Sequence, residues 1–256
     1  MKQFYLFLSF ILMLSANALQ AQNDSIYFWK NGTLKLKESI KTVDLDSITF
    51  KRLVAANPNV TIGTQVWATK NLDVSTYSDG RLIPQVTDAA TWAALTTGAW
   101  CYINNDSAFG TTYGKLYNWY AVAGIWNEVS KTDESQRKKL APSGYHIPSE
   151  AEWTTLTDYL GGYNVAGEAM REVDTAHWFS PNAGATNSSG FTALPGGYRN
   201  YPGNFASSRF SGYWWSSSAD GTTANAWNRG LYYNSGSVYR SSDSKKIGFS
   251  VRCIKD

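Results

Sequence analysis

Apolar residues first gather at the start of the chain, where residues 4–14 form an almost unbroken hydrophobic run. Lys2 precedes this run, and small residues follow it, so that residues 16–18 or 19–21 would serve as the cleavage site of a secretory leader. The run is too short to cross a bilayer, and no second run follows. The pattern therefore predicts a signal peptide over residues 1–22, a secreted or cell-surface protein, and no integral membrane span.

Short alternating segments occupy residues 23–57. The segments SIYFWK and TLKLK flank Asn31-Gly32, a dipeptide that favours the two-residue turn of a β-hairpin. Residues 46–50 read as a further short strand, and residues 55–59 as a linker. A piece of this size cannot bury a core of its own. We therefore expect a small β-hairpin segment at 23–57, followed by a main domain at 58–256.

Helical periodicity occurs in three places in the main domain. Residues 87–92 predict a short helix with Thr87 as its cap and Gly98 as its stop, and residues 113–124 predict another. The clearest helix is in PSEAEWTTLTDYLGG, where Ser149 and Glu152 form a capping box. Its residues 153, 156 and 160 are apolar and share one face. The remainder predicts short strands and Gly-, Ser- and Asn-rich loops, which indicates an α+β, loop-rich domain with few helices.

Charge and composition narrow the classes of partner. The chain carries a net charge of +3, and removal of Lys2 with the leader lowers it to +2. A net charge this small gives no strongly basic surface of the kind that binds nucleic acid, so we expect no nucleic-acid partner. The two cysteines, Cys101 and Cys253, could form one disulfide in an exported protein, or they could be two separate buried thiols. Sequence alone leaves both readings open, together with the oligomeric state.

Catalytic and metal-binding patterns are absent from the sequence. It has only two histidines, His146 and His177, and no His-x-x-x-His or Cys-x-x-Cys spacing, which excludes a histidine-rich zinc site. We interpret both histidines as hydrogen-bonded framework residues. Residues 104–106 and Asp220 lie in loops and carry oxygen ligands, so calcium binding stays an alternative. No other cofactor is expected. No nucleophile elbow, phosphate loop or distinctive carboxylate pair occurs, and we expect no enzymatic activity.

Residues 198–240 have the composition of a binding surface. They contain six Tyr, three Trp and four Arg, but a single Asp and no Glu or Lys. Tyr and Trp supply contact area at low entropic cost, Ser, Gly and Asn supply adaptable hydrogen bonds, and Arg anchors ligands. Part of these aromatic residues must instead be core, including at least one of Trp214 and Trp215. The candidate ligand-binding residues are Tyr201, Asn204, Arg209, Asn228, Arg229, Tyr232, Asn234 and Tyr239.

Several motifs of the main domain occur together and in order: WATKNL, GAWCYINND, YGKLYNWYAV, SGYHIPSEAEWTTL, GFTALPGGYRN, YWWSSS and GFSVRCIKD. In this the chain resembles the Fibrobacter succinogenes major paralogous domain family. GYHIPSEAEW and GFSVRC also resemble, more distantly, the formylglycine-generating enzyme group. That resemblance implies a C-type-lectin-like fold. The enzyme's chemistry needs a cysteine pair shortly before the terminal motif, and residues 227–247 contain no Cys, so its activity does not carry over. Cys253 matches only the terminal, structural cysteine.

Together these features predict an exported, non-catalytic binding module that recognises carbohydrate or a surface protein. Two alternatives remain. One is an enzyme related to the formylglycine-generating group or an unrecognised hydrolase. The other is a structural surface or adhesion protein in which the hairpin segment pairs with another chain through its edge.

Overall fold

The computed structural model describes the backbone of residues 25–30 and 33–39 and all of residues 59–256. The chain divides into two compact units, Met1–Val54 and Ala55–Asp256. Four predictions fall outside the described residues: the signal peptide at 1–22, the Asn31-Gly32 turn, the strand at 46–50 and most of the linker at 55–59. Among the described residues, no helix has the length and apolar character needed to cross a membrane.

The described part of the first unit is a pair of strands. Strand β1 (Ser25–Lys30) runs antiparallel to β2 (Thr33–Ser39), with Lys30 opposite Thr33. The predicted pairing of the two alternating segments is thereby confirmed.

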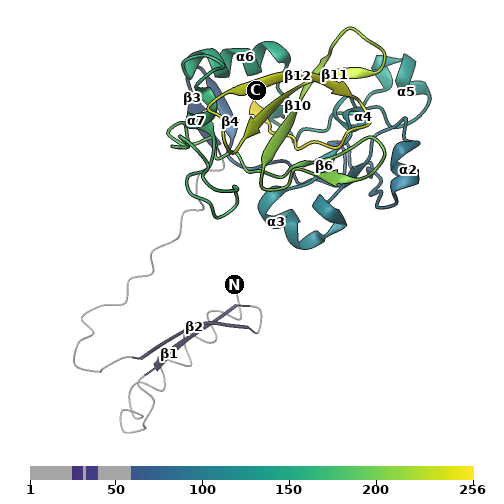
Figure 1. Cartoon of the computed structure of the whole chain (residues 1–256). Helices are drawn as coiled ribbons and strands as arrows, with labels where there is room; N and C mark the ends of the chain where they lie inside the picture. The colour runs from purple at the N-terminus through teal and green to yellow at the C-terminus, as the bar shows by residue number, and fades with distance from the viewer. Residues whose placement is uncertain (1–24, 31–32, 40–58) are drawn as a thin grey trace. The chain divides into compact units, whose positions relative to one another are not determined.

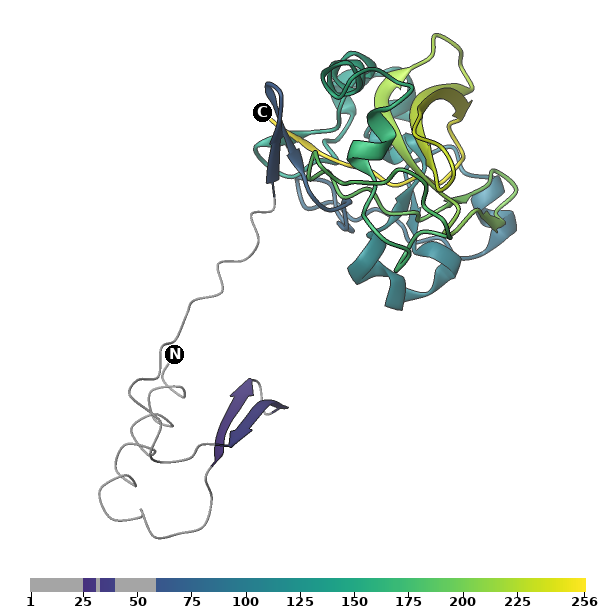
Figure 2. The same cartoon turned by 60° about the vertical axis from the view of Figure 1, so that its left-hand side comes forward.

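The second unit is an α+β domain built from small antiparallel sheets. One sheet has the order β3 (Asn59–Ile62), β4 (Gln65–Ala68), β13 (Ile254–Lys255) and β7 (Tyr145–His146). Strand β13 thus lies between an early and a central strand of the domain, and Figure 2 shows the C-terminus beside the β3–β4 hairpin. Two further sheets have two strands each, β5 (Trp100–Cys101) with β6 (Leu116–Tyr117) and β8 (Tyr198–Arg199) with β9 (Phe205–Ala206).

The longest strands form a three-stranded sheet, β10 (Ser211–Ala219), β11 (Asn225–Tyr232) and β12 (Val238–Ser244), which crosses the middle of the domain in Figure 1. Directly opposed residues share a face of a sheet. Tyr213, Gly230 and Tyr239 therefore lie on one face, and Trp214, Arg229 and Arg240 lie on the other.

Helix α6 (Glu150–Tyr159) begins where the sequence predicts. The Ser149 hydroxyl accepts the backbone N–H of Glu152, and the Glu152 carboxylate accepts the backbone N–H of Ser149 at 2.7 Å, which completes the capping box. Trp153 and Leu156 are fully buried. The other helices of the described residues are α2 (Ala89–Ala93), α3 (Gly110–Tyr113), α4 (Trp119–Val122), α5 (Val129–Thr132) and α7 (Ala166–Met170).

Two helix predictions need correction. The cap of α2 is Asp88 rather than Thr87, because the Asp88 carboxylate accepts the backbone N–H of Thr91 at 2.7 Å, and the helix ends at Ala94, well before Gly98. The helix predicted over residues 113–124 is in fact β6 followed by the single turn α4. Asn118 separates them, since its side chain accepts the backbone N–H of Ala121.

Aromatic residues dominate the core. Beneath α6, Trp67, Trp153 and Trp214 are fully buried, and the rings of Trp67 and Trp153 lie 4.8 Å apart. A second cluster includes Trp215 and Phe249, whose rings lie 4.5 Å apart. The prediction that Trp214 or Trp215 is core is therefore confirmed for both.

Three fully buried arginines, Arg171, Arg199 and Arg252, tie the long loops to this core. Arg199 donates to the backbone carbonyls of Val86, Thr87 and Gly203, and the other two likewise donate mainly to backbone carbonyls. A guanidinium presents five N–H donors in one plane, so one side chain can collect carbonyls from several irregular segments. These contacts supply the backbone partners that regular sheets and helices would otherwise provide.

Candidate functional site

The sequence-predicted binding residues do not form one surface. Asn228, Tyr232 and Tyr239 share a face of the three-stranded sheet, while Arg229 lies on the opposite face. Asn234 follows β11 in the turn that leads to β12.

The remaining three candidates lie on other loops. Tyr201 and Asn204 are exposed on the turn between β8 and β9, which lies against α2 because Gly203 in that turn approaches the backbone of Ala89. Arg209 is exposed and has a φ of 70°, and its Nε donates to the backbone carbonyl of His177.

Arg229 has to be withdrawn from the candidate surface. Its side chain is 3% exposed, and its two terminal nitrogens lie 2.7 and 2.9 Å from the carboxylate oxygens of Glu150. Arg240 also binds Glu150 and stacks on Trp227, with its guanidinium 3.6 Å from the ring centroid. This group joins the sheet to the first turn of α6.

Four tyrosines, which we call the tyrosine row, lie one on each of the strands β8, β10, β11 and β12: Tyr198, Tyr213, Tyr232 and Tyr239. Successive rings lie 5.3, 5.9 and 4.8 Å apart and meet edge to face. The Tyr213 hydroxyl donates to the Tyr232 hydroxyl at 3.0 Å. Gly230 makes room for the row, because a Cβ there would lie 3.1 Å from the Tyr213 ring. Tyr239, at the edge strand, keeps 42% of its surface exposed.

Polar groups accompany the exposed end of the row. Ser241 and Asp243 follow Tyr239 on the same face of β12, and Ser241 is exposed. Asn228 is fully buried and donates to the Asp243 carboxylate at 2.9 Å, but its own Oδ1 has no hydrogen-bond partner among the described residues. An unpaired buried acceptor is costly and uncommon in folded proteins. Asn228 is as buried as Arg229 and is withdrawn from the candidate surface with it, so the exposed groups at this end of the sheet are Tyr239 and Ser241.

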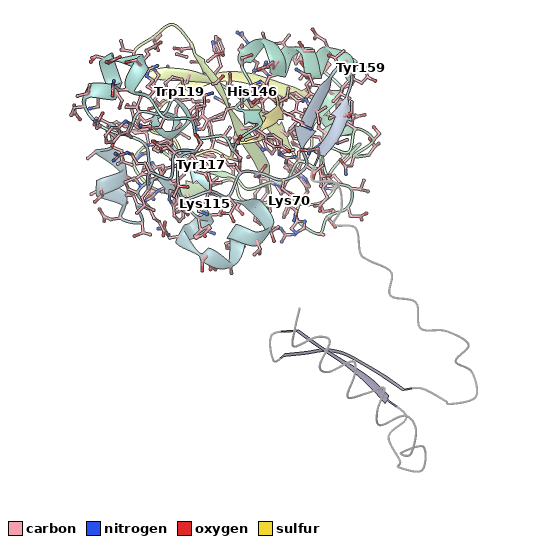
Figure 3. The ribbon with its side chains drawn as sticks, turned by 180° about the vertical axis from the view of Figure 1, so that it is seen from behind. Lys70, Lys115, Tyr117, Trp119, His146 and Tyr159 are labelled. Carbon is pink, nitrogen blue, oxygen red and sulfur yellow. The ribbon has the colours of Figure 1, made fainter. Side chains whose placement is uncertain are left out.

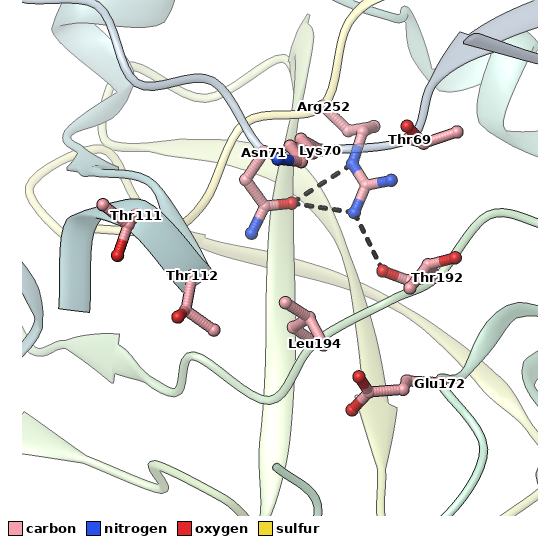
Figure 4. A pocket seen from close by; sticks show the side chains of 9 residues that line it. All are labelled: Thr69, Lys70, Asn71, Thr111, Thr112, Glu172, Thr192, Leu194 and Arg252. Carbon is pink, nitrogen blue, oxygen red and sulfur yellow. Dashed lines mark hydrogen bonds between the residues drawn. The ribbon is translucent and has the colours of Figure 1, made fainter. Parts of the chain in front are cut away.

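A pocket of about 280 Å³ opens elsewhere in the domain (Figure 4). Asn71 organises one wall, because its Oδ1 accepts from Trp214 and from Arg252 and its Nδ2 donates to the carbonyl of Tyr113. The lining residues are Thr69, Lys70, Asn71, Thr111, Thr112, Glu172, Thr192, Leu194 and Arg252.

Glu172 lies on the opposite side of this pocket and pairs with His177. His177 Nδ1 lies 2.9 and 2.8 Å from the two Glu172 carboxylate oxygens, and the His177 ring packs edge-on against Tyr113. Burial, and then the Glu172 charge, raise the pKa of Tyr113, while Arg209 opposes this shift. Arg209 therefore lies close enough to influence the pocket, although the sequence assigned it to a different surface.

The remaining candidate chemical groups have structural partners. Lys115, which is labelled in Figure 3, is buried and forms an ion pair with Asp73. Its Nζ lies 4.5 Å from the centre of the Trp100 ring. The Tyr117 hydroxyl donates to the carbonyl of Val74 and accepts from its N–H. These contacts hold both side chains in place within the domain.

The two cysteines are separate free thiols, so the disulfide that the sequence left open is not formed. Burial raises the pKa of both Cys101 and Cys253 to about 12. They lie in different hydrophobic clusters, Cys101 with Trp92 and Cys253 with Phe249.

The loop residues considered for calcium are used in turns. The Asp106 carboxylate accepts the N–H of Ala108, and that of Asp220 accepts the N–H of Thr222. Within residues 59–256 no group of three or more His, Cys, Asp or Glu side chains is placed to hold a metal ion.

Sequence reasoning missed Tyr198, Tyr213 and the whole pocket. The row depends on cross-strand register, and the pocket lining comes from segments up to about 180 residues apart, so no local pattern could have revealed either.

Comparison with known proteins identifies the family to which the chain belongs. Neither the curated proteins nor the solved structures contain a match to this chain. The family model of the Fibrobacter succinogenes major domain matches residues 60–255, which is most of the chain and includes the tyrosine row and the pocket. The chain therefore belongs to the Fibrobacter succinogenes major domain family.

Proposed function

We propose that the protein is an exported, non-catalytic binding module with a C-type-lectin-like fold, and that it recognises carbohydrate through the exposed end of the tyrosine row. The observation that carries this proposal is the combination, on one face of the edge strand β12, of the exposed Tyr239 ring, which packs on Tyr232, with Ser241 and Asp243.

The chemistry of sugars suits this edge. The C–H bonds of a pyranose ring pack against aromatic faces, and its hydroxyls donate to carboxylate and amide oxygens. Ser241 follows Tyr239 on the same face of β12 at a distance of about 7 Å along the strand, so a sugar over the Tyr239 ring could reach it, and a longer chain of sugars could also reach Asp243. The tyrosine rings hold one another at fixed angles, which lowers the entropic cost of binding.

Oxidase chemistry of the formylglycine-generating kind is less well supported. That chemistry uses reactive cysteines, and a reactive cysteine needs a lowered thiol pKa and some exposure. Both cysteines of this chain are buried, with the pKa raised to about 12.

Recognition of a surface protein is a second candidate, favoured by one observation. Phe179 and Phe210 stack with their ring centres 4.6 Å apart, remain 42% and 43% exposed, and both contact Tyr233 edge-on. Exposed aromatic clusters are common anchors of protein interfaces.

The test of the carbohydrate proposal is a screen of the purified protein on glycan arrays and insoluble polysaccharides. A specific hit should be lost with Tyr239→Ala and weakened with Asp243→Asn. Tyr159→Ala is the matched control, because Tyr159 is an exposed tyrosine on α6 and should not affect binding (Figure 3). Binding that survives Tyr239→Ala would refute the assigned surface. No hit in the whole screen, with a protein ligand lost on Phe210→Ala, would favour the second candidate.

A further inference from the structure

The pocket bounded by Asn71, Thr192 and Arg252 has an unbalanced charge. Arg252 is fully buried, and all five of its N–H groups are engaged by oxygens of Ala68, Asn71, Phe191 and Thr192. None of these acceptors is a carboxylate. Burial lowers the pKa of Arg252 to about 9, so the guanidinium still carries its charge at neutral pH. The wall of the pocket therefore holds a fixed positive charge that no acid neutralises.

A second cation lies on the same pocket. Lys70 is exposed and makes no hydrogen bond or ion pair with the residues that the structure describes. Glu172 is the one acidic residue of the lining, and it is engaged by His177. The electrostatic potential in the pocket is accordingly positive on the side of Lys70 and Arg252. On the opposite side, Glu172 offers a hydrogen-bond acceptor.

The backbone at Thr192 is strained. Thr192 has a φ of 54°, a conformation that is rare for a β-branched residue. Asn187 holds it there, because the Asn187 Oδ1 accepts the Thr192 N–H at 2.8 Å and the Asn187 Nδ2 donates to the Thr192 hydroxyl at 3.0 Å. Strain that is held by surrounding hydrogen bonds concentrates at binding sites.

Size and lining restrict the ligand. The volume of about 280 Å³ lies just below the range of about 300–1,000 Å³ that suits drug-sized ligands, so the pocket fits a molecule of roughly monosaccharide size. The hydroxyls of Thr111 and Thr112 and the carboxylate of Glu172 offer hydrogen-bond partners for ligand hydroxyls (Figure 4).

We propose that this pocket binds a small hydroxylated carboxylate of the sugar-acid class. The ligand carboxylate would pair with Lys70 in the field of Arg252, and its hydroxyls would bind Glu172 and the threonines. The pocket shares no residue with the tyrosine row, so this inference does not depend on the proposed function.

The test is calorimetric titration of the full chain with ligands that share a ring and differ in charge. Glucuronate and galacturonate are the anionic probes, glucose and galactose are their neutral parents, and glucosamine is the cationic probe. We expect measurable binding of a uronate, weaker binding of its parent and none of glucosamine. Lys70→Met should weaken uronate binding about tenfold or more, as loss of a charge-assisted hydrogen bond does. Lys139→Met, which alters an exposed lysine outside the pocket, should leave it unchanged.

Three results would overturn the proposal: no uronate binding, equal affinity for a uronate and its neutral parent, or an affinity that Lys70→Met does not change. Thermal unfolding of the Lys70→Met protein checks that its fold is intact, which we expect because Lys70 is exposed. Tyr239→Ala separates the two proposals, since it should abolish polysaccharide binding and leave uronate binding intact.

Discussion

At the scale of single residues, His146 shows how a framework histidine can set pH dependence. Its Nδ1 lies 2.7 Å from Asp256 Oδ1, and its Nε2 lies 2.7 Å from Glu152 Oε1. Two carboxylate partners require both ring nitrogens to donate, which favours the imidazolium. Partial burial lowers the pKa of His146, but the hydrogen bonds to Glu152 and Asp256 outweigh this, and the pKa is raised overall from 6.5.

We predict that His146→Gln destabilises the protein more at pH 6 than at pH 9. The stabilisation from charged His146 is fully present below pH 6.5 and is lost as pH rises through the raised pKa. The pKa of Glu152 is lowered from 4.5, so its contribution is present above that value and is lost as pH falls below it, outside the two pH values compared. Thermal unfolding of the two proteins at pH 6 and pH 9 measures the difference. An equal loss of Tm at both pH values would contradict the prediction that protonated His146 stabilises the fold through Glu152 and Asp256.

At the scale of elements, the start of α6 depends on both local and distant residues. Ser149 and Glu152 close the capping box within four residues of sequence. Glu150, next to the cap, instead binds Arg229 on β11 and Arg240 on β12. The helix is thus begun by its own sequence and fixed to the sheet by an ion-pair group.

Glu150→Ala should lower the free energy of unfolding by about 3 kcal/mol, because it leaves the buried Arg229 guanidinium without its carboxylate. Glu128→Ala is the control, since Glu128 forms an exposed ion pair with Lys131, and we expect a loss of only a few tenths of a kcal/mol. Urea denaturation of both variants gives the two values. Similar losses of unfolding free energy in the two variants would mean that the Glu150 ion pair stabilises the protein no more than an exposed ion pair does.

Prediction of elements from sequence succeeded where the signal was local. The helix at 150–159 was predicted correctly because its cap, its apolar face and its Gly161 stop lie within the segment itself. The helix predicted over residues 113–124 failed because Leu116 and Tyr117 pair with β5, so tertiary pairing overrides the helical spacing. At 87–92 two adjacent capping residues competed, and the side chain of Asp88 reaches Thr91.

At the scale of the whole molecule, the core of residues 59–256 spans nearly the full length of the second unit. Its three hydrophobic clusters use residues between Ile62 and Ile254 only. Strand β13 pairs with both β4 and β7, so the last strand closes a sheet that the first strands of the domain begin.

We therefore predict that a fragment of residues 55–256 folds without residues 1–54. It should unfold in a single cooperative transition, because residues 59–256 form three hydrophobic clusters and join the first and last strands of the domain in one sheet. Calorimetry combined with near-ultraviolet circular dichroism of the buried tryptophans tests this. A fragment without a thermal transition would show that the domain needs the preceding segment.

The sequence by itself determined the α+β class, the family, the capped helix at 150–159 and the binding-surface composition of residues 198–240, because each is written in local pattern or in ordered motifs. Tertiary structure alone decided which of those residues are available. It buried Arg229 against Glu150, aligned Tyr198 and Tyr213 with Tyr232 and Tyr239, and kept the two cysteines apart. It also brought residues 69–71, 111–112, 172, 192, 194 and 252 around one pocket. The physical reason is that strand register and loop packing bring together residues far apart along the chain, and no short stretch of sequence encodes those distances.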